Sequence, residues 1–87
     1  MGLLVYKVQP VYPAEARRKG IQGKVILRAV ISKEGRIEQL TLISGPKELA
    51  APAIGAVQQW RYKPYLLMGD PVEVDTEIVV NFTLSRW

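Results

Sequence analysis

Residues 72–85 read VEVDTEIVVNFTLS, and the alternation of side chains along this stretch decides the fold. The even positions carry apolar side chains or threonine, whereas the odd positions are acidic or polar apart from one valine. A period of two sends successive side chains to opposite faces of a strand, so one row faces a core and the other faces water. No proline or glycine interrupts the run. We therefore predict one long strand, the last of a small sheet.

The length of this strand suggests a function as well. A typical strand has about 5–6 residues, so this one is expected to extend past its neighbours and to leave main-chain groups unpaired. Unpaired strand edges recruit other strands. Two interpretations stay open at this point: the stretch is only the last strand of its sheet, or its edge binds an extended partner.

Two apolar runs upstream predict a hairpin. One face of residues 23–32 carries Val25, Leu27, Ala29 and Ile31. A second apolar run begins at Ile37, after a short connection that contains Gly35, and this arrangement is typical of two antiparallel strands. The spacing from Ile37 to Leu40 breaks the alternation and predicts a bulge.

Two further stretches predict helices. Pro13 and Gly20 stand where a short first helix should begin and end. The second helix shows one apolar stripe, made of Leu49, Ala53, Ala56, Val57 and Trp60. Proline is tolerated in the first turn only, so Pro52 predicts a start near residue 50, and Lys63-Pro64 predicts the end. Gly55, inside the helix, suggests close packing on the sheet.

The order helix, strand, strand, helix, strand predicts an α+β fold, in which two helices pack on one face of a small antiparallel three-stranded sheet. The chain has 87 residues, of which 48% are hydrophobic, and this suits one domain. Residues 3–8 add a short strand or an extended arm, so we divide the chain into an N-terminal arm, 1–8, and a domain, 9–87. Trp60 and Phe82 are expected in the core, because their apolar stripes converge.

The composition argues against an enzyme. The chain has no histidine and no cysteine, which removes the commonest general base, the commonest metal ligand and the thiol nucleophile. Glu73, Asp75 and Glu77 share one strand face and offer oxygen ligands, but a solvated acidic row is the simpler interpretation. We predict a non-enzymatic protein without a catalytic, metal or cofactor site.

Nucleic acid is one alternative partner. Residues 60–65 interleave Trp60, Arg61, Tyr62, Lys63 and Tyr65, a mixture that binders of single strands use for stacking. The formal net charge of +4 favours acidic partners in general. However, Trp60 lies on the apolar helix stripe, and the acidic row near the C-terminus repels phosphates. A protein partner is therefore preferred, and no nucleic acid is expected.

Five short motifs follow one another along the chain: QPxYP at 9–13, GIxGxV at 20–25, EGRI at 34–37, VxxWRYxP at 57–64 and IVVNF at 78–82. In this order and spacing they resemble the C-terminal domain of the TonB energy-transducer family of Gram-negative bacteria. The resemblance covers residues 9–84, nearly the whole chain.

The resemblance implies a docking domain in the periplasm that belongs to a longer protein, anchored to the inner membrane and driven by proton-powered motor proteins through a segment absent from this sequence. It implies that the domain binds the TonB box, a short peptide of an outer-membrane transporter, by strand addition to the last strand. The residues concerned are Gln9, Ile78, Val79, Val80, Asn81, Phe82, Thr83 and Leu84. Similar domains occur on membrane sensors, so a scaffold role is a second alternative.

Two expectations about partners follow. Strand addition takes its affinity from main-chain hydrogen bonds, which an over-long strand offers. The same edge predicts a concentration-dependent homodimer, which is favoured when the arm is shortened, because the arm would cover part of the edge. Residues 3–8 are far shorter than the roughly 20 apolar residues of a membrane span, so no direct membrane insertion by this fragment is expected.

Overall fold

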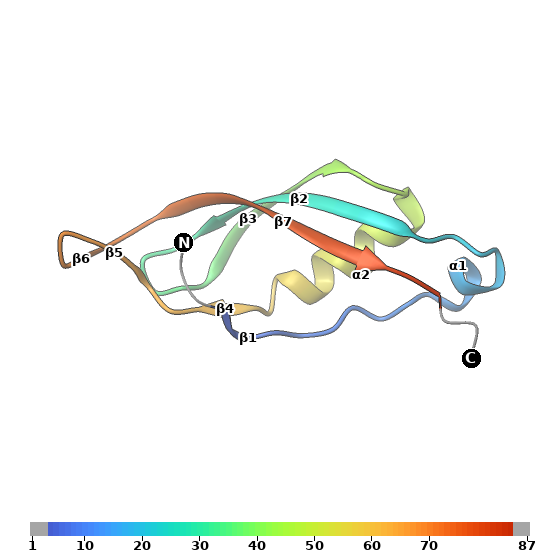
Figure 1. Ribbon diagram of the computed structural model, residues 1–87, viewed down its shortest axis with the longest axis horizontal. Coiled ribbons are helices and arrows are strands. Elements are labelled where there is room, and N and C mark those ends of the chain that lie inside the picture. The colour runs from blue at the N-terminus through green and yellow to red at the C-terminus, as the bar shows by residue number, and fades with distance from the viewer. Residues whose placement is uncertain (1–3, 85–87) are drawn as a thin grey trace.

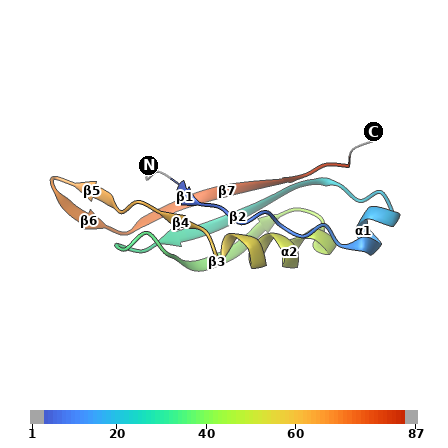
Figure 2. The same ribbon diagram turned by 90° about the horizontal axis from the view of Figure 1, so that it is seen from below.

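The computed structural model describes residues 4–84, which form an α+β domain around a three-stranded antiparallel sheet. Strand β2 (Gly23–Ile31) lies in the centre, between β3 (Ile37–Ser44) and β7 (Val74–Phe82) (Figure 1). Helix α2 (Lys47–Val57) covers one face, and the short helix α1 (Ala14–Arg18) lies toward one end on the same side (Figure 2). The predicted fold class is confirmed.

The two pairings of β2 differ in regularity. Strand β7 pairs with β2 without a shift, from Gly23 opposite Phe82 to Ile31 opposite Val74. The pairing of β2 with β3 shifts twice, and one shift lies between Leu40 and Ile37 of β3. This shift is the predicted bulge.

The core lies between the sheet and α2. Its members from the sheet and from α2 occupy alternate positions of β2 and β7 and the inner side of α2: Val25, Leu27, Ala29, Ile31, Leu49, Ala53, Val57, Ile78, Val80 and Phe82. Trp60 and Phe82 are 6% and 2% exposed, as predicted. The ring of Tyr12 stands edge-on to Phe82, with centroids 5.4 Å apart, and Ala16 of α1 is buried nearby. These contacts hold the first helix against the end of the sheet.

The prediction of one strand over residues 72–85 is wrong at both ends, because β7 runs from Val74 to Phe82 and residues 83 and 84 lie outside any strand. With 9 residues β7 is as long as β2, so it does not extend past this neighbour as expected. The alternation itself is confirmed from Val74 to Phe82, but residues 65–72 form a separate hairpin of β5 (Tyr65–Leu67) and β6 (Asp70–Val72). The chain therefore changes partner at Glu73, which belongs to neither strand. Alternation alone does not reveal such a change, because both partners accept the same period. Ser85 lies outside the described residues.

The predicted start and end of the second helix are also wrong. The helix begins at Lys47 and ends at Val57, so Pro52 lies in its middle. Pro52 lacks the N–H that would bond to the Glu48 carbonyl, and the helix forgoes this single bond. Leu49, which is fully buried ahead of the proline, holds the first turn in place. Gly55 is exposed, and an added Cβ would meet nothing within 4 Å, so close packing does not explain this glycine.

The N-terminal arm contains a strand, but its partner is not β7. Strand β1 (Leu4–Tyr6) pairs with β4 (Arg61–Tyr62), the two residues that follow Trp60. Residues 1–3 of the arm lie outside the described part. Strand β4 is in turn fixed to the β2–β3 turn, because the Tyr62 N–H donates to the Gly35 carbonyl at 2.8 Å. Gly35 has a φ of 86°, and a Cβ there would lie 1.8 Å from the Tyr62 oxygen, so only glycine fits.

Candidate functional site

The outer edge of β7 is the most regular unpaired strand edge of the sheet. Within residues 4–84, β7 pairs with β2 alone. Beyond the strand, the Leu84 N–H donates to Gln22 Oε1 at 3.0 Å, on the side of β2. Because main-chain groups alternate along an extended antiparallel strand, the even residues then bond toward β2, and Val79, Asn81 and Thr83 direct their N–H and C=O groups outward. The outer edge thus presents a row of donors and acceptors.

A second segment runs alongside this edge without pairing with it. Residues 7–10 follow β7 (Figure 1), and a hollow of about 150 Å³ lies between the two. Its lining residues are Lys7, Gln9, Pro10, Trp60, Val79, Val80 and Asn81. The hollow is therefore bounded on one side by the outer part of β7 and on the other by the N-terminal segment.

Trp60 fixes the position of this N-terminal segment. Its Nε1–H donates to the Val8 carbonyl at 2.9 Å, and the Lys7 ammonium lies 5.5 Å from the centre of its ring. A buried indole normally finds such a partner, so the hydrogen bond satisfies Trp60 and holds the segment in one contact. A second, larger hollow of about 230 Å³ lies between the segment and α2, and Gln9 lines both.

Four of the eight residues that the resemblance assigns to partner binding line one hollow: Gln9, Val79, Val80 and Asn81. The side chains of Ile78, Val80 and Phe82 are buried in the core, and their main-chain groups bond toward β2, so these three residues offer little to a partner at the outer edge. Thr83 is exposed, and Leu84 is half-buried with its N–H already bonded. The structure therefore divides the eight assigned residues into those that line the hollow and those that do not.

The sequence did not indicate three residues of the hollow: Lys7, Pro10 and Trp60. The sequence predicts Trp60 in the core, or in a stacking run under the nucleic-acid alternative, and does not indicate that its ring nitrogen reaches the N-terminal segment. The alternation of apolar and polar residues along the chain does not predict that residues 7 and 10 lie next to residue 80. The sequence offers one indication of this contact. A tryptophan on an apolar stripe buries its indole N–H, and a buried indole N–H needs a hydrogen-bond acceptor from another segment.

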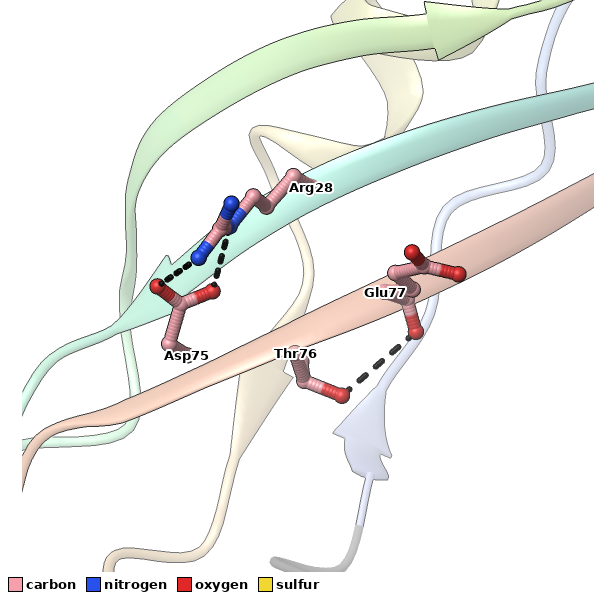
Figure 3. Close-up of polar contacts among 4 residues, drawn as sticks. All are labelled: Arg28, Asp75, Thr76 and Glu77. Atoms are coloured by element: carbon pink, nitrogen blue, oxygen red, sulfur yellow. Dashed lines mark hydrogen bonds and ion pairs between the residues drawn. The ribbon is translucent and has the colours of Figure 1, made fainter.

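The acidic row on the exposed face of β7 is engaged by a cation. Arg28 of β2 forms two hydrogen bonds of 3.0 Å to Asp75, diagonally across the strands, while Glu77 lies directly opposite (Figure 3). This hydrogen-bonded pair lowers the pKa of Asp75 below its usual value and raises the pKa of Arg28. Asp75 therefore acts as a link between β2 and β7.

The aromatic and basic run at residues 60–65 does not form a stacking surface around Trp60. Trp60 is buried, and Tyr62 is half-buried, pairing with Leu4 in the short β1–β4 ladder. Partial burial raises the pKa of the Tyr62 phenol. A base needs an open ring face on which to stack, so the most prominent aromatic residue of the run is unavailable for it.

The comparison with known families agrees with this geometry. The model described as "Gram-negative bacterial TonB protein C-terminal" matches residues 8–84. The chain belongs to the TonB C-terminal family. Protein TonB of Vibrio cholerae serotype O1 is 36% identical over 85 residues, which are 95% of this chain and 35% of that protein. Protein TonB of Xanthomonas campestris pv. campestris (strain B100) is 28% identical over 78 residues, 87% of this chain and 35% of that protein.

Solved structures share the fold of this TonB C-terminal domain. The solution NMR structure of the Pseudomonas aeruginosa TonB CTD gives a TM-score of 0.81 at 23% identity, and the match covers 97% of this chain and 87% of that one. A structure of the tonb2 protein from Vibrio anguillarum gives 0.72 at 27% identity, covering 99% and 84%. The chain spans about a third of the length of the curated relatives it matches. Neither helix within residues 4–84 is long and apolar enough to cross a membrane.

Proposed function

We propose that this domain binds the TonB box of an outer-membrane transporter as an added strand along the outer edge of β7, and that it transmits force without catalysing a reaction. The observation that carries the proposal is the unpaired edge of β7 beside the hollow that Gln9 lines. An extended peptide gains main-chain hydrogen bonds at such an edge without requiring the domain to change its fold.

The outward groups define how the peptide is held. Val79, Asn81 and Thr83 each offer one N–H and one C=O, so a peptide strand bonds to every second residue of β7. The exposed side chains of Val79 and Asn81 contact those peptide side chains that lie on the open face of the sheet. The alternate peptide side chains turn toward the hollow, where they meet Gln9 and the edge of Trp60.

The wider role rests on family membership. Because the chain spans about a third of its TonB relatives, the periplasmic location, the inner-membrane anchor and the contact with proton-driven motor proteins are proposed for the longer protein. In that arrangement this domain is the end that couples inner-membrane energy to active transport. The alternative role, a scaffold domain of a membrane sensor, would use a similar domain. The sequence upstream of this domain in the longer protein would distinguish a transport role from a sensor role.

Proline substitution tests the docking edge. Asn81→Pro removes one outward N–H and places a ring in the path of the peptide, yet a true edge tolerates it. We expect a folded domain whose affinity for a TonB-box peptide falls at least about tenfold, or ~1.4 kcal/mol. Amide shifts on titration with the peptide measure the affinity, and circular dichroism checks the fold.

Two matched variants sharpen the result. Asn81→Ala keeps the main chain and should weaken binding by roughly 1 kcal/mol or less. Val80→Pro removes an N–H that bonds toward β2 and is expected to unfold the domain. If Val79→Pro and Asn81→Pro both fold and bind like the parent, the outer edge of β7 is not the docking site.

A further inference from the structure

The turn of the β5–β6 hairpin departs from two local rules. Met68 and Gly69 occupy its two central positions with φ of 52° and 87°, a pair of positive values as in a type I′ turn. Asn-Gly is the preferred pair there, because few residues other than glycine and asparagine adopt a positive φ readily. Met68 is also 96% exposed. An apolar side chain that is strained and fully exposed gives the fold nothing, and such departures are expected at functional positions.

Leu66 and Leu67 extend this exposed apolar surface. They are 57% and 59% exposed, and with Met68 they form what we call the apolar tip. Leu66 and Leu67 are neighbours in β5, so their side chains point to opposite faces of the hairpin. The hairpin projects at the end of the long axis of the molecule, away from α2 and from the main sheet (Figure 1).

This shape favours a lipid surface over a protein pocket. A pocket in a partner receives one face of a strand, whereas the apolar tip is exposed on both faces and at the turn between them. A bilayer surrounds an inserted tip on all sides and therefore covers all three side chains. Neither of the two hollows described above is lined by residues of the tip.

Cations gather behind the apolar tip. Strand β4 is held to the β2–β3 turn by the hydrogen bond from Tyr62 to Gly35 and by an antiparallel bridge between Arg36 and Arg61. The exposed cations at the base of the hairpin, which we call the basic collar, are Lys33, Arg36, Arg61 and Lys63. A tip that enters the headgroup region brings such cations to the level of the lipid phosphates.

Carboxylates at the same end of the molecule limit the electrostatic contribution to the affinity for a lipid surface. Glu34 lies in the same turn as Lys33 and Arg36, Asp70 and Glu73 lie in and directly after β6, and all three are exposed. Against the four cations of the basic collar, these three carboxylates leave an excess of one positive charge. The apolar tip must then supply most of the affinity, and anionic lipid adds to it. Asp70 belongs to the hairpin itself, and its charge stays at the headgroup level, so only the side chains of the apolar tip pass beyond the headgroups.

We propose that the β5–β6 hairpin binds the surface of a phospholipid bilayer, with the apolar tip among the upper acyl chains and the basic collar at the headgroup phosphates. The contact is interfacial and needs no spanning segment. It is made at the hairpin end of the molecule and leaves the outer edge of β7 beyond Ile78 open. A domain docked on a transporter through β7 can therefore bind the adjacent lipid surface through the hairpin at the same time.

Sedimentation with vesicles tests the proposal, using phosphatidylcholine with and without phosphatidylglycerol. We expect the parent chain to bind both kinds and to bind the anionic kind severalfold more strongly. Met68→Asn suits the positive φ, so it should fold at least as well as the parent and yet lower binding roughly threefold. The triple variant Leu66→Ser, Leu67→Ser, Met68→Asn should lower binding roughly tenfold or more. Val11→Ser removes another exposed apolar side chain, which lies outside the hairpin, and should leave vesicle binding unchanged.

A label at the tip gives a second readout. The chain has no cysteine, so Met68→Cys and Val11→Cys each carry a single environment-sensitive fluorophore. With vesicles present, we expect a blue shift and protection from an aqueous quencher at position 68, but not at position 11. The proposal is overturned if the parent does not sediment with vesicles, if the triple variant sediments equally, or if a label at 68 stays accessible to the quencher. A hairpin that contacts a protein instead would give the first and third of these results. None of these measurements involves the peptide edge, so their failure leaves the proposed docking function untouched.

Discussion

The main sheet has two outer strands, β3 and β7, and they differ as templates for a further strand. Strand β7 pairs with β2 in continuous register over its whole length, so its outward groups are evenly spaced. Strand β3 shifts register twice against β2, and each bulge bends the strand and disturbs the alternation of its outward groups. Bulges of this kind protect an edge from unwanted pairing. A regular register therefore favours the addition of a further strand, and this is why β7 rather than β3 is proposed as the docking strand.

The surroundings of the two edges reinforce this difference. The edge of β7 is flanked by residues 7–10, which leave a hollow beside it and are held by the bond from Trp60 to Val8. The chain after β3 leaves the sheet at Gly45, where a Cβ would lie 2.9 Å from the Lys24 carbonyl.

Peptide titration tests the difference between the two edges, because amide shifts should appear at Val79 and Asn81 and be absent at Leu40 and Leu42 of β3. Shifts of equal size on both strands would remove the distinction.

The largest expected effect is on Trp60, which joins the core to the wall of the hollow. Trp60→Ala should cost roughly 3–5 kcal/mol of unfolding free energy, because it leaves a cavity and an unpaired Val8 carbonyl. Trp60→Phe keeps most of the ring and loses the hydrogen bond, so it should cost about 1 kcal/mol and loosen residues 7–10. Denaturant titration measures both. A loss below 1 kcal/mol for alanine would show that the side chain is not a core anchor.

The next effect concerns the homodimer. Removing residues 1–8 deletes the Lys7 contact and the Val8 acceptor, so the edge of β7 loses its flanking segment. We expect the shortened chain to dimerise through β7 at millimolar concentration, while the parent dimerises more weakly. Sedimentation of the two chains measures the difference, and Asn81→Pro in the shortened chain should abolish the dimer. Two monomeric chains at that concentration would contradict the prediction.

The sequence predicts those features that depend on local period and misses those that depend on partners. Alternation placed Ile78, Val80 and Phe82 in the core, and helical spacing placed Leu49 and Trp60 there. Alternation did not reveal that β6 and β7 have different partners, because each side of Glu73 fits the same period. The rule for proline misplaced the start of α2, because a buried Leu49 outweighs one lost hydrogen bond. At the candidate site, the QPxYP motif predicts Gln9. Lys7 is not predicted, because its position depends on its contact with Trp60, which is distant in the sequence.

A smaller effect is expected at Gly55 of α2. This glycine is exposed, and an added methyl meets nothing within 4 Å outside the helix, so Gly55→Ala should stabilise the domain by about 0.5–1 kcal/mol. The residue lines the larger hollow beside Val8 and Gln9, away from β7. Thermal unfolding measures the gain, and peptide titration should show unchanged docking. Destabilisation would indicate a contact at Gly55 that the alanine disturbs, and weaker docking would place the larger hollow within the site.

The smallest effect is the pH dependence of the Arg28–Asp75 pair, which links β7 to β2 on the side away from the docking edge. The hydrogen bonds from Arg28 lower the pKa of Asp75 in the folded chain below its value of about 3.8 in the unfolded chain. Stability from this pair is therefore present above that unfolded value and is lost as the pH falls through the lower folded pKa. Asp75→Asn should thus lower the unfolding midpoint slightly at neutral pH, and the difference from the parent should shrink as acid protonates Asp75.

Glu77→Gln is the matched control for this last comparison. Glu77 lies directly opposite Arg28 but does not make the paired hydrogen bonds, so Glu77→Gln should lower the unfolding midpoint at neutral pH less than Asp75→Asn does. Both side chains lie on the exposed face of the sheet, whereas the groups proposed to dock the peptide are main-chain atoms at its outer edge. Both variants should therefore bind the peptide like the parent. If Asp75→Asn weakens docking as much as Asn81→Pro, the face of β7 takes part in recognition together with its edge.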